Sequence, residues 1–323
     1  MCRVPERRRT SMPRIDMDPI DIARHPPDPP WLRYSGTLSE HEEREFIPFF
    51  HRLIGVAFAT IRPYFLQPLA VESKADLSPV TQADRQTELA LRTLISERYP
   101  RHAVLGEEFG ARAGGPFRWV LDPIDGTRAF VSNCFLFGTL IALERQVNDG
   151  TADDGSGAAG FVPVLGCVAH CATGAALIGH RGGTTLFLSD GTRRKVRMRG
   201  CERLQDATVL STSTWVGNEQ KDLADIEGVA RAARMYRTWG DCFGYFSLAT
   251  GGADVMLDPQ LKHWDVAAVV PVIEGAGGRV TSWAGGSPLR DSSLIATAGG
   301  VHDQVLELLR HSSSPATTRM RNG

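Results

Sequence analysis

The feature that most constrains this chain is a short apolar run that ends in two acidic residues, Asp122 and Asp125. The run Trp119-Val-Leu predicts a buried strand, and Pro123 fixes its own φ and biases the preceding residue toward an extended conformation. Both carboxylates can then face one hard cation, with the carbonyl of Ile124 between them. On spacing alone, an ordinary Asx-rich turn that caps a helix explains this pattern equally well.

Further polar residues follow predicted strands or begin predicted helices. The pair Gly126-Thr127 would open the next helix, whose free N–H groups favour an anion such as phosphate. Glu107 and Glu108 come after a short strand. Asp265 begins a helix, where a carboxylate either caps the N-terminus, which is the more common role, or holds a metal. Asp84 is similarly ambiguous, as part of a helix start or of a catalytic pair.

Four ordered motifs together resemble the inositol monophosphatase family over about residues 39–310. They are Asp76-Leu-Ser-Pro-Val-Thr-Gln-Ala-Asp84, Gly106-Glu-Glu108, Asp122-Pro-Ile-Asp-Gly-Thr127, and Trp264-Asp265 with Glu274-Gly-Ala-Gly-Gly278. Within that family the chain is most similar to the histidinol-phosphatase branch. Three segments favour that branch: residues 78–85, Gly106-Glu-Glu-Phe-Gly110, and Arg237-Thr-Trp-Gly-Asp-Cys-Phe-Gly-Tyr245.

The resemblance implies two to three Mg²⁺ ions, because hydrolysis of a phosphate monoester needs an activated water and a neutralised leaving oxygen. The implied metal ligands are Glu107, Asp122, the Ile124 carbonyl, Asp125 and Asp265. Glu107 and Thr127 would orient the attacking water, and Asp84 would hold the Thr127 hydroxyl as its base partner. The backbone N–H groups of Gly126 and Thr127 would bind the phosphate.

The substrate end of the site is less constrained. Inositol-specific relatives carry Gly-(Ser/Thr)-Ala-Ala where this chain has Gly240-Asp-Cys-Phe243. The acidic residue that contacts substrate in relatives falls on Asp258. The expected substrate-binding residues are therefore Gly126, Thr127, Gly240, Asp241, Cys242, Asp258 and Asp265. Histidinol phosphate carries an ammonium and an imidazole, which suit Asp241 and Asp258. Alternatively, Asp241 only caps the helix that starts near Phe243.

The leading hypothesis is therefore a Mg²⁺-dependent histidinol-phosphate phosphatase of histidine biosynthesis. One enzymatic alternative is an inositol-1-phosphate phosphatase, or a broad sugar-phosphate phosphatase on the same scaffold. A third possibility is a protein that binds phosphate or metal without catalysis. The family resemblance also implies a homodimer.

The hydrophobic periodicity predicts two halves and a layered fold. Helices are expected over residues 39–65, 83–98, 218–232, 243–250, 264–274 and 301–310. Strands are expected over 103–105, 118–121, 135–143, 162–169, 175–179, 208–211, 233–237, 253–257, 279–281 and 293–296. The first half (39–191) is typical of an α+β arrangement and the second (192–311) of an α/β arrangement, flanked by a disordered leader (1–38) and tail (312–323). The family implies an αβαβα sugar-phosphatase-like fold, with most metal ligands in the first half.

Composition excludes several other classes of protein. The 323 residues include 36 Lys and Arg against 37 Asp and Glu, and this near balance argues against a nucleic-acid partner. The sequence contains no run of about 18 apolar residues, so no membrane-spanning helix is predicted. The six scattered cysteines are typical of reduced thiols in a cytoplasmic protein. The one local cluster, Cys167-Val-Ala-His-Cys171, is better explained by a buried strand than by a zinc site.

Overall fold

The computed structural model describes residues 36–74, 79–147, 160–213 and 220–312. Most of the predicted leader and tail lies outside the described residues, as do Asp76 and Ser78. No helix in the described ranges is both long and apolar enough to span a lipid bilayer.

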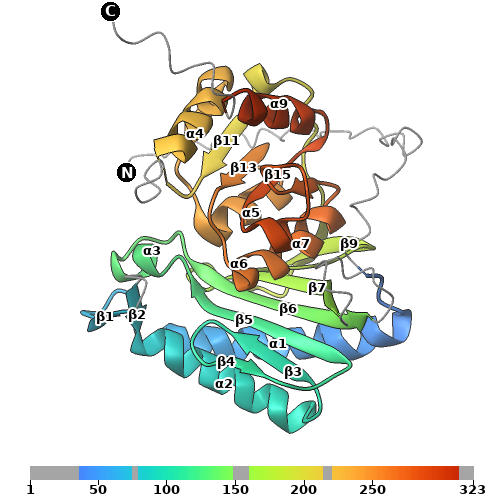
Figure 1. The fold of residues 1–323 in the computed structure, drawn as a ribbon. Coiled ribbons are helices and arrows are strands. Elements are labelled where there is room, and N and C mark those ends of the chain that lie inside the picture. Colours follow the sequence, from blue (N-terminus) through green and yellow to red (C-terminus); the bar gives the residue numbers. More distant parts are fainter. Residues whose placement is uncertain (1–35, 75–78, 148–159, 214–219, 313–323) are drawn as a thin grey trace, which may run out of the picture.

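Five layers make up the molecule (Figure 1). Helices α1 (Glu40–Ile61) and α2 (Gln82–Arg98) cover the outer face of an eight-stranded sheet, the large sheet. Helices α5 (Asp241–Ala249), α6 (His263–Ala267) and α7 (Val269–Gly275) lie between this sheet and a five-stranded one, the small sheet. Helices α4 (Gln220–Ala232) and α9 (His302–Ser312) pack together beyond the small sheet. The predicted αβαβα layering is confirmed.

The large sheet has the strand order β10-β9-β8-β7-β6-β5-β3-β4. Its strands are β3 (Ala103–Gly106), β4 (Gly110–Arg112), β5 (Phe117–Asp125), β6 (Gly138–Val147), β7 (Gly160–His170), β8 (Ala175–His180), β9 (Gly183–Phe187) and β10 (Arg193–Val196). Every pairing is antiparallel except that of β3 with β5. Strands β1 (Val71–Ser73) and β2 (Pro79–Thr81) form a separate two-stranded sheet, and α3 (Thr127–Val131) follows β5.

The small sheet has the order β12-β11-β13-β15-β14. Its strands are β11 (Thr208–Ser211), β12 (Met235–Arg237), β13 (Val255–Asp258), β14 (Arg279–Thr281) and β15 (Leu294–Thr297). Strand β11 is parallel to both neighbours, whereas β15 is antiparallel to β13 and β14. Three short helices complete this region: η2 (Leu204–Asp206), α8 (Pro288–Asp291) and η3 (Gly299–Val301).

Local sequence signals explain where the first two helices begin. Ser39 and Glu42 form a capping box at the start of α1, and Thr81 and Asp84 form one at the start of α2. These reciprocal bonds satisfy backbone N–H groups that no helical carbonyl can reach. The predicted starts of both helices are therefore confirmed to within a residue or two.

One helix predicted from the sequence is wrong in its extent. The segment expected as a single helix over 264–274 is divided into α6 and α7, with Ala268 between them. Pro271 has no N–H to donate to the carbonyl of Ala267, and its ring crowds that carbonyl, which favours a break in the helix at this point. The strand expected at 135–143 begins only at Gly138, and the short strands β1, β2, β4, β9 and β10 were not predicted.

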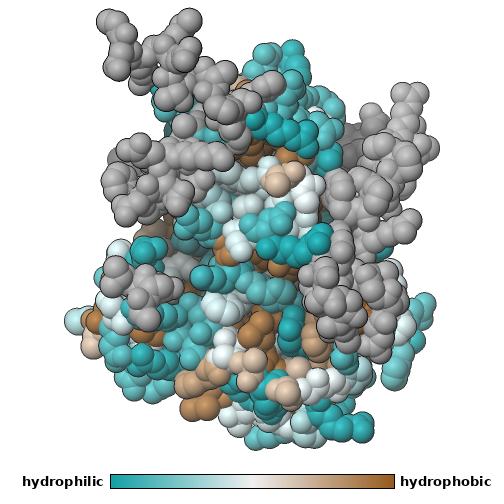
Figure 2. Space-filling model, viewed as in Figure 1, coloured by the Kyte–Doolittle hydropathy of each residue, from teal (hydrophilic) through white to brown (hydrophobic). Residues whose placement is uncertain are grey.

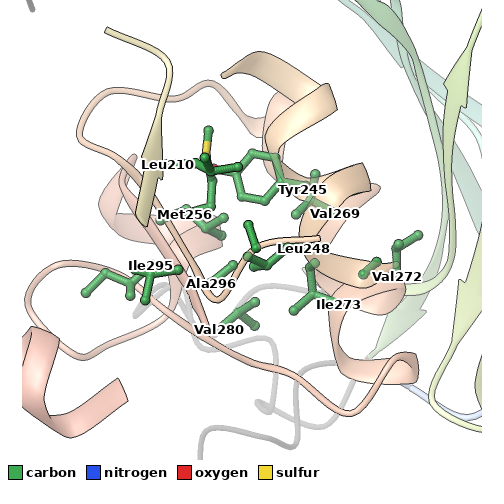
Figure 3. Packing of buried hydrophobic residues seen from close by; sticks show 14 of the residues in the cluster. Leu210, Tyr245, Leu248, Met256, Val269, Val272, Ile273, Val280, Ile295 and Ala296 are labelled. Carbon is green, nitrogen blue, oxygen red and sulfur yellow. The ribbon is translucent and has the colours of Figure 1, made fainter. Parts of the chain in front are cut away.

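Two hydrophobic cores hold the layers together. The outer core lies between the large sheet and α1 and α2, and contains Phe50, Trp119 and Leu121. The inner core lies between the two sheets; Figure 3 shows Tyr245 and Leu248 of α5 and Ile273 of α7 packed against side chains of the small sheet. Figure 2 shows that most of one face of the molecule is hydrophilic, with hydrophobic side chains mainly in its lower part.

Candidate active site

A bulge in β5 places Asp122 and Asp125 on the same face of the large sheet. Asp122 pairs with Leu140 and Asp125 with Gly138, so two residues of β5 oppose one residue of β6. Residues three apart normally face opposite sides of a strand, and one extra residue reverses that alternation. The Thr139 hydroxyl donates to the Pro123 carbonyl over 2.8 Å, which satisfies the carbonyl inside the bulge.

Asp265 of α6 completes an acidic cluster with this pair. One carboxylate oxygen from each of Asp122, Asp125 and Asp265 lies within 4.8 Å of the other two. Asp265 uses Oδ2 to accept the Lys262 N–H over 2.7 Å, so the helix-start and cluster roles that the sequence left as alternatives occur together. The cluster therefore joins the large sheet to a helix from the other half of the chain.

Like charges lie close together in this cluster. Burial, followed by the charges of neighbouring carboxylates, raises the pKa of Asp122 and of Asp125 well above the usual range. The same two causes raise the pKa of Asp265 to about 8. The buried Oδ1 of Asp122 has no hydrogen-bond partner among the described residues. An orphaned carboxylate oxygen inside an all-oxygen set fits a hard divalent cation.

Thr127 lies between the bulge and the start of α2. Its hydroxyl is 3.0 Å from the Ile124 carbonyl oxygen and 3.4 Å from Asp84 Oδ1. The other Asp84 oxygen accepts the Thr81 N–H and hydroxyl over 2.8 and 2.6 Å. Burial raises the pKa of Asp84 despite these bonds from Thr81. The structure thus brings Asp84 and Thr127 together, as the sequence predicts.

Gly126 adopts a conformation that a side chain would disturb. Its φ is +82°, and a Cβ there would lie 2.8 Å from the Leu136 carbonyl oxygen and 3.1 Å from Asp241 Oδ2. L-residues rarely adopt this left-handed region. The backbone of the bulge can therefore approach Asp241 only because position 126 is glycine.

Glu107 stands at the edge of the acidic cluster and has a cationic partner that the sequence did not indicate. Lys74 Nζ is 2.6 Å from Glu107 Oε1 and 2.5 Å from Glu108 Oε1. The turn that carries both glutamates is fixed by Glu88 of α2, which accepts the N–H of Glu108 over 2.7 Å. Glu88 is fully buried on the side of α2 that faces the core. A glutamate at a core-facing position of a predicted helix was the signal by which the sequence could have indicated this role.

Asp241 also has an unusual backbone conformation. Its φ is +49°, its N–H donates to the Thr212 hydroxyl over 2.9 Å, and α5 begins at this residue with Gly240 as its N-cap. The alternative that Asp241 caps a helix starting near Phe243 is therefore wrong. No hydrogen bond reaches its carboxylate from the described residues. Burial, followed by the charges of Asp258 and Asp265, raises the pKa of Asp241 to about 7.

The other predicted substrate residues have protein partners. The Cys242 N–H donates to Asp125 Oδ2, which connects α5 to the acidic cluster. Asp258 is buried and accepts the Tyr245 hydroxyl over 2.7 Å and the Thr212 N–H over 3.1 Å. Burial raises the pKa of Asp258 to about 6, with the two hydrogen bonds opposing that effect. Thr212 and Tyr245 thus fix both acids, a role that the sequence did not assign to them.

The Cys167 to Cys171 cluster is part of the outer core. Both thiols are buried there, and Cys167 lies within β7. The His170 ring is already engaged, with Nδ1 2.7 Å from the Thr173 hydroxyl and Nε2 2.6 Å from the Phe135 carbonyl. The buried-strand interpretation is therefore confirmed.

Comparisons with known proteins identify several similar phosphatases. The bifunctional phosphatase IMPL2 of Arabidopsis thaliana is 33% identical over 285 residues, which cover 84% of this chain and 77% of the relative. A histidinol-phosphatase of Streptomyces coelicolor is 34% identical over 254 residues, covering 78% of this chain and 91% of the relative. An inositol-1-monophosphatase of Rhizobium meliloti is 32% identical over 237 residues, covering 71% and 82%.

A solved structure is similar over most of both chains. It is an inositol monophosphatase from Zymomonas mobilis, 33% identical, with a TM-score of 0.70 over 84% of this chain and 100% of that one. The model of the inositol monophosphatase family matches residues 42–314, and this range contains every acidic residue of the cluster. The chain therefore belongs to the inositol monophosphatase family, whose members are metal-dependent phosphatases acting on small phosphate esters.

Proposed function

We propose that this protein is a Mg²⁺-dependent histidinol-phosphate phosphatase, which converts L-histidinol phosphate and water to L-histidinol and phosphate. The observation that carries the choice of substrate is the Asp241 carboxylate, which accepts no hydrogen bond from the described residues and adjoins the acidic cluster. A cationic substrate group can form a charge-assisted hydrogen bond with it, which a neutral polyol cannot.

The residues that would hold Mg²⁺ are Glu107, Asp122, Asp125, Asp265 and the Ile124 carbonyl. Their oxygen donors and the orphaned Asp122 Oδ1 match the preference of Mg²⁺ for a few carboxylates completed by water and phosphate oxygens. When bound, Mg²⁺ lowers the pKa of water and neutralises charge on the phosphate and the leaving oxygen.

Thr127 and Asp84 would move the proton of the attacking water. The Thr127 hydroxyl accepts that proton as it gives its own to Asp84 Oδ1, 3.4 Å away. Asp84 is suited to receive a proton because burial has already raised its pKa. The N–H groups of Gly126 and Thr127 would contact the phosphate, and Glu107 would help to orient the water.

Asp241 and Asp258 would have different roles toward the leaving alcohol. Asp258 is committed to Tyr245 and Thr212, so it supports the wall of the site and adds negative charge. No hydrogen bond from the described part of the chain reaches the Asp241 carboxylate, and its backbone is left-handed, a conformation that costs about 1–3 kcal/mol for residues other than glycine. Strain of this kind at a charged residue supports a binding role for Asp241 itself. Relatives named as histidinol-phosphatases support the same substrate.

Inositol 1-phosphate is the second candidate substrate, because relatives and a solved structure named for inositol monophosphatases match with similar identity. The test is kcat/KM on histidinol phosphate and on inositol 1-phosphate, with Mg²⁺ and then with a chelator. We expect histidinol phosphate to be preferred and the chelator to abolish turnover. A preference for inositol 1-phosphate would reject our substrate assignment. Binding of phosphate esters without turnover would instead support a non-catalytic protein.

A further inference from the structure

Glu144 is a buried carboxylate that the proposed chemistry does not use. It lies within β6, its side chain is 0% exposed, and it contacts two basic side chains. Arg118 Nε, from the paired position of β5, is 2.5 Å from Glu144 Oε2, and His263 Nε2 is 2.7 Å from Oε1. Burial alone would raise the pKa of Glu144, but His263 and Arg118 outweigh that effect, and its pKa is lowered.

The three residues of this Arg118–Glu144–His263 triad come from two layers of the fold. Arg118 and Glu144 belong to the large sheet, whereas His263 is the first residue of α6. Helix α6 packs on β5 and β6, and it carries Asp265 two residues after His263. The triad therefore connects the large sheet directly to the helix that supplies one ligand of the acidic cluster.

Helix α6 is too short to fix the position of Asp265 by itself. It has five residues, and isolated helices of that length are unstable because the first turn is costly to form. Asp122 and Asp125 are already fixed to the large sheet by the bulge in β5. Asp265 comes from a different layer, so its position must be fixed relative to the same sheet. The contact between His263 Nε2 and Glu144 Oε1, at 2.7 Å, links its helix to that sheet.

We propose that Glu144 is a positioning residue for the metal site: through His263 it holds α6 so that Asp265 faces Asp122 and Asp125. This inference rests on the proposed metal site. It goes beyond that site because Glu144 lies outside the acidic cluster and would act only through His263.

The test compares Glu144→Leu and Glu144→Gln with a matched control, Asp254→Asn. Asp254 is also a buried carboxylate held by arginine, since it accepts from Arg199 and from the Thr208 N–H. Asp254 directly precedes β13. At about 3.3 Å per residue of extended chain, it lies about 13 Å from Asp258. The control should lose stability without disturbing α6.

Binding of Mn²⁺ and of Mg²⁺ to the metal-free proteins is measured by calorimetry at a single pH. Changing a residue that orients metal ligands typically weakens binding 10- to 100-fold, and we expect a loss of about that size for Glu144→Leu. Glu144→Gln, which keeps an oxygen for His263, should lose less. Asp254→Asn should bind metal within twofold of the unchanged protein. Saturating Mg²⁺ should restore much of kcat in both Glu144 variants.

Hydrogen exchange supplies a readout that needs no metal. In metal-free Glu144→Leu or Glu144→Gln, the amides of residues 263–267 should exchange faster, and in Asp254→Asn they should not. Unchanged metal affinity and unchanged exchange in the Glu144 variants would overturn the positioning role while leaving the proposed function intact. If the unchanged protein bound neither metal ion, the proposed metal site and this inference would fall together.

Discussion

The two sides of the site are built in different ways. On the large-sheet side, Asp122, Asp125 and Thr127 lie within six consecutive residues, and one bulge orients both carboxylates. On the other side, Asp241, Asp258 and Asp265 come from three elements; Thr212 contacts the first two, and the Lys262 N–H bonds to the third. The first side depends on local sequence and would carry the reaction. The second depends on tertiary contacts, and it would supply one metal ligand, Asp265, and select the substrate.

The largest effect is expected on the large-sheet side. Asp122→Asn should remove a metal ligand and reduce kcat/KM on any phosphate monoester about a thousandfold, since charge stabilisation by a metal contributes several kcal/mol. The metal-free variant should unfold at no lower temperature, because a buried carboxylate with a strongly raised pKa has been neutralised. Activity and thermal unfolding are measured beside exposed Asp190→Asn, which should match the unchanged protein. Retained activity would reject the metal-cluster mechanism.

Asp241→Asn tests the selective side. Loss of a charged hydrogen bond costs about 1.5–3 kcal/mol, so kcat/KM on histidinol phosphate should fall about 10- to 100-fold. The kcat/KM of this variant on inositol 1-phosphate should stay within a few fold of that of the unchanged protein. Tyr245→Phe removes a bond to Asp258 and is the comparison variant, since it should affect both substrates equally. An equal loss on both substrates in Asp241→Asn would mean that this residue does not select between them.

Gly126→Ala tests the place where the two sides meet. The left-handed backbone and the contacts with Leu136 and Asp241 should lower the free energy of unfolding by about 1–3 kcal/mol. Activity should fall as well, because the added Cβ pushes the bulge away from Asp241. Gly200→Ala is the control, since its Cβ would meet no atom within 4 Å. Equal stability of the two variants in denaturant titrations would show that the bulge tolerates a side chain.

The pH dependence of stability tests the acidic residues of the selective side together rather than one at a time. The folded-state pKa values of Asp258, Asp241 and Asp265 are raised from 3.8 to about 6, 7 and 8. Between pH 4 and 8 the folded protein therefore holds protons that the unfolded chain has lost, so unfolding releases protons and stability falls as pH rises. Thermal scans of metal-free protein should show a falling midpoint across this window, with a smaller fall in saturating Mg²⁺. A midpoint that rose with pH would contradict the raised pKa values.

Sequence reasoning succeeded where structure is determined locally. The capping boxes at Ser39 and Thr81 and the strand before Asp122 depend on residues within a few positions, so their signals are visible in the chain. The bulge in β5 was not visible, because it depends on pairing with β6. Asp265 and Asp84 could be named from motifs, but only folding brings Asp84 to within 3.4 Å of Thr127.

Contacts between distant segments were the part that could not be predicted. Lys74 reaches Glu107 across 33 residues, and His263 reaches Glu144 across 119. Hydrophobic periodicity shows which face of an element is buried, but it does not show which distant charged residues meet. The sequence therefore carried no signal for either pair. The division of 264–274 into two helices had a signal in the sequence, because Pro271 disfavours a continuous helix, although Pro48 is accommodated inside α1.

The Lys74 contact would make metal loading at the proposed site an exchange of cations. Its ammonium neutralises Glu107 and Glu108 at 2.6 and 2.5 Å, and an incoming Mg²⁺ would compete for the same Glu107 carboxylate. By thermodynamic linkage, whatever strengthens the Lys74 contact weakens the apparent metal affinity by the same factor. Lys74 directly follows β1, a strand with three exposed residues. The strength of the Lys74–Glu107 contact would therefore set part of the Mg²⁺ concentration at which the proposed enzyme becomes active.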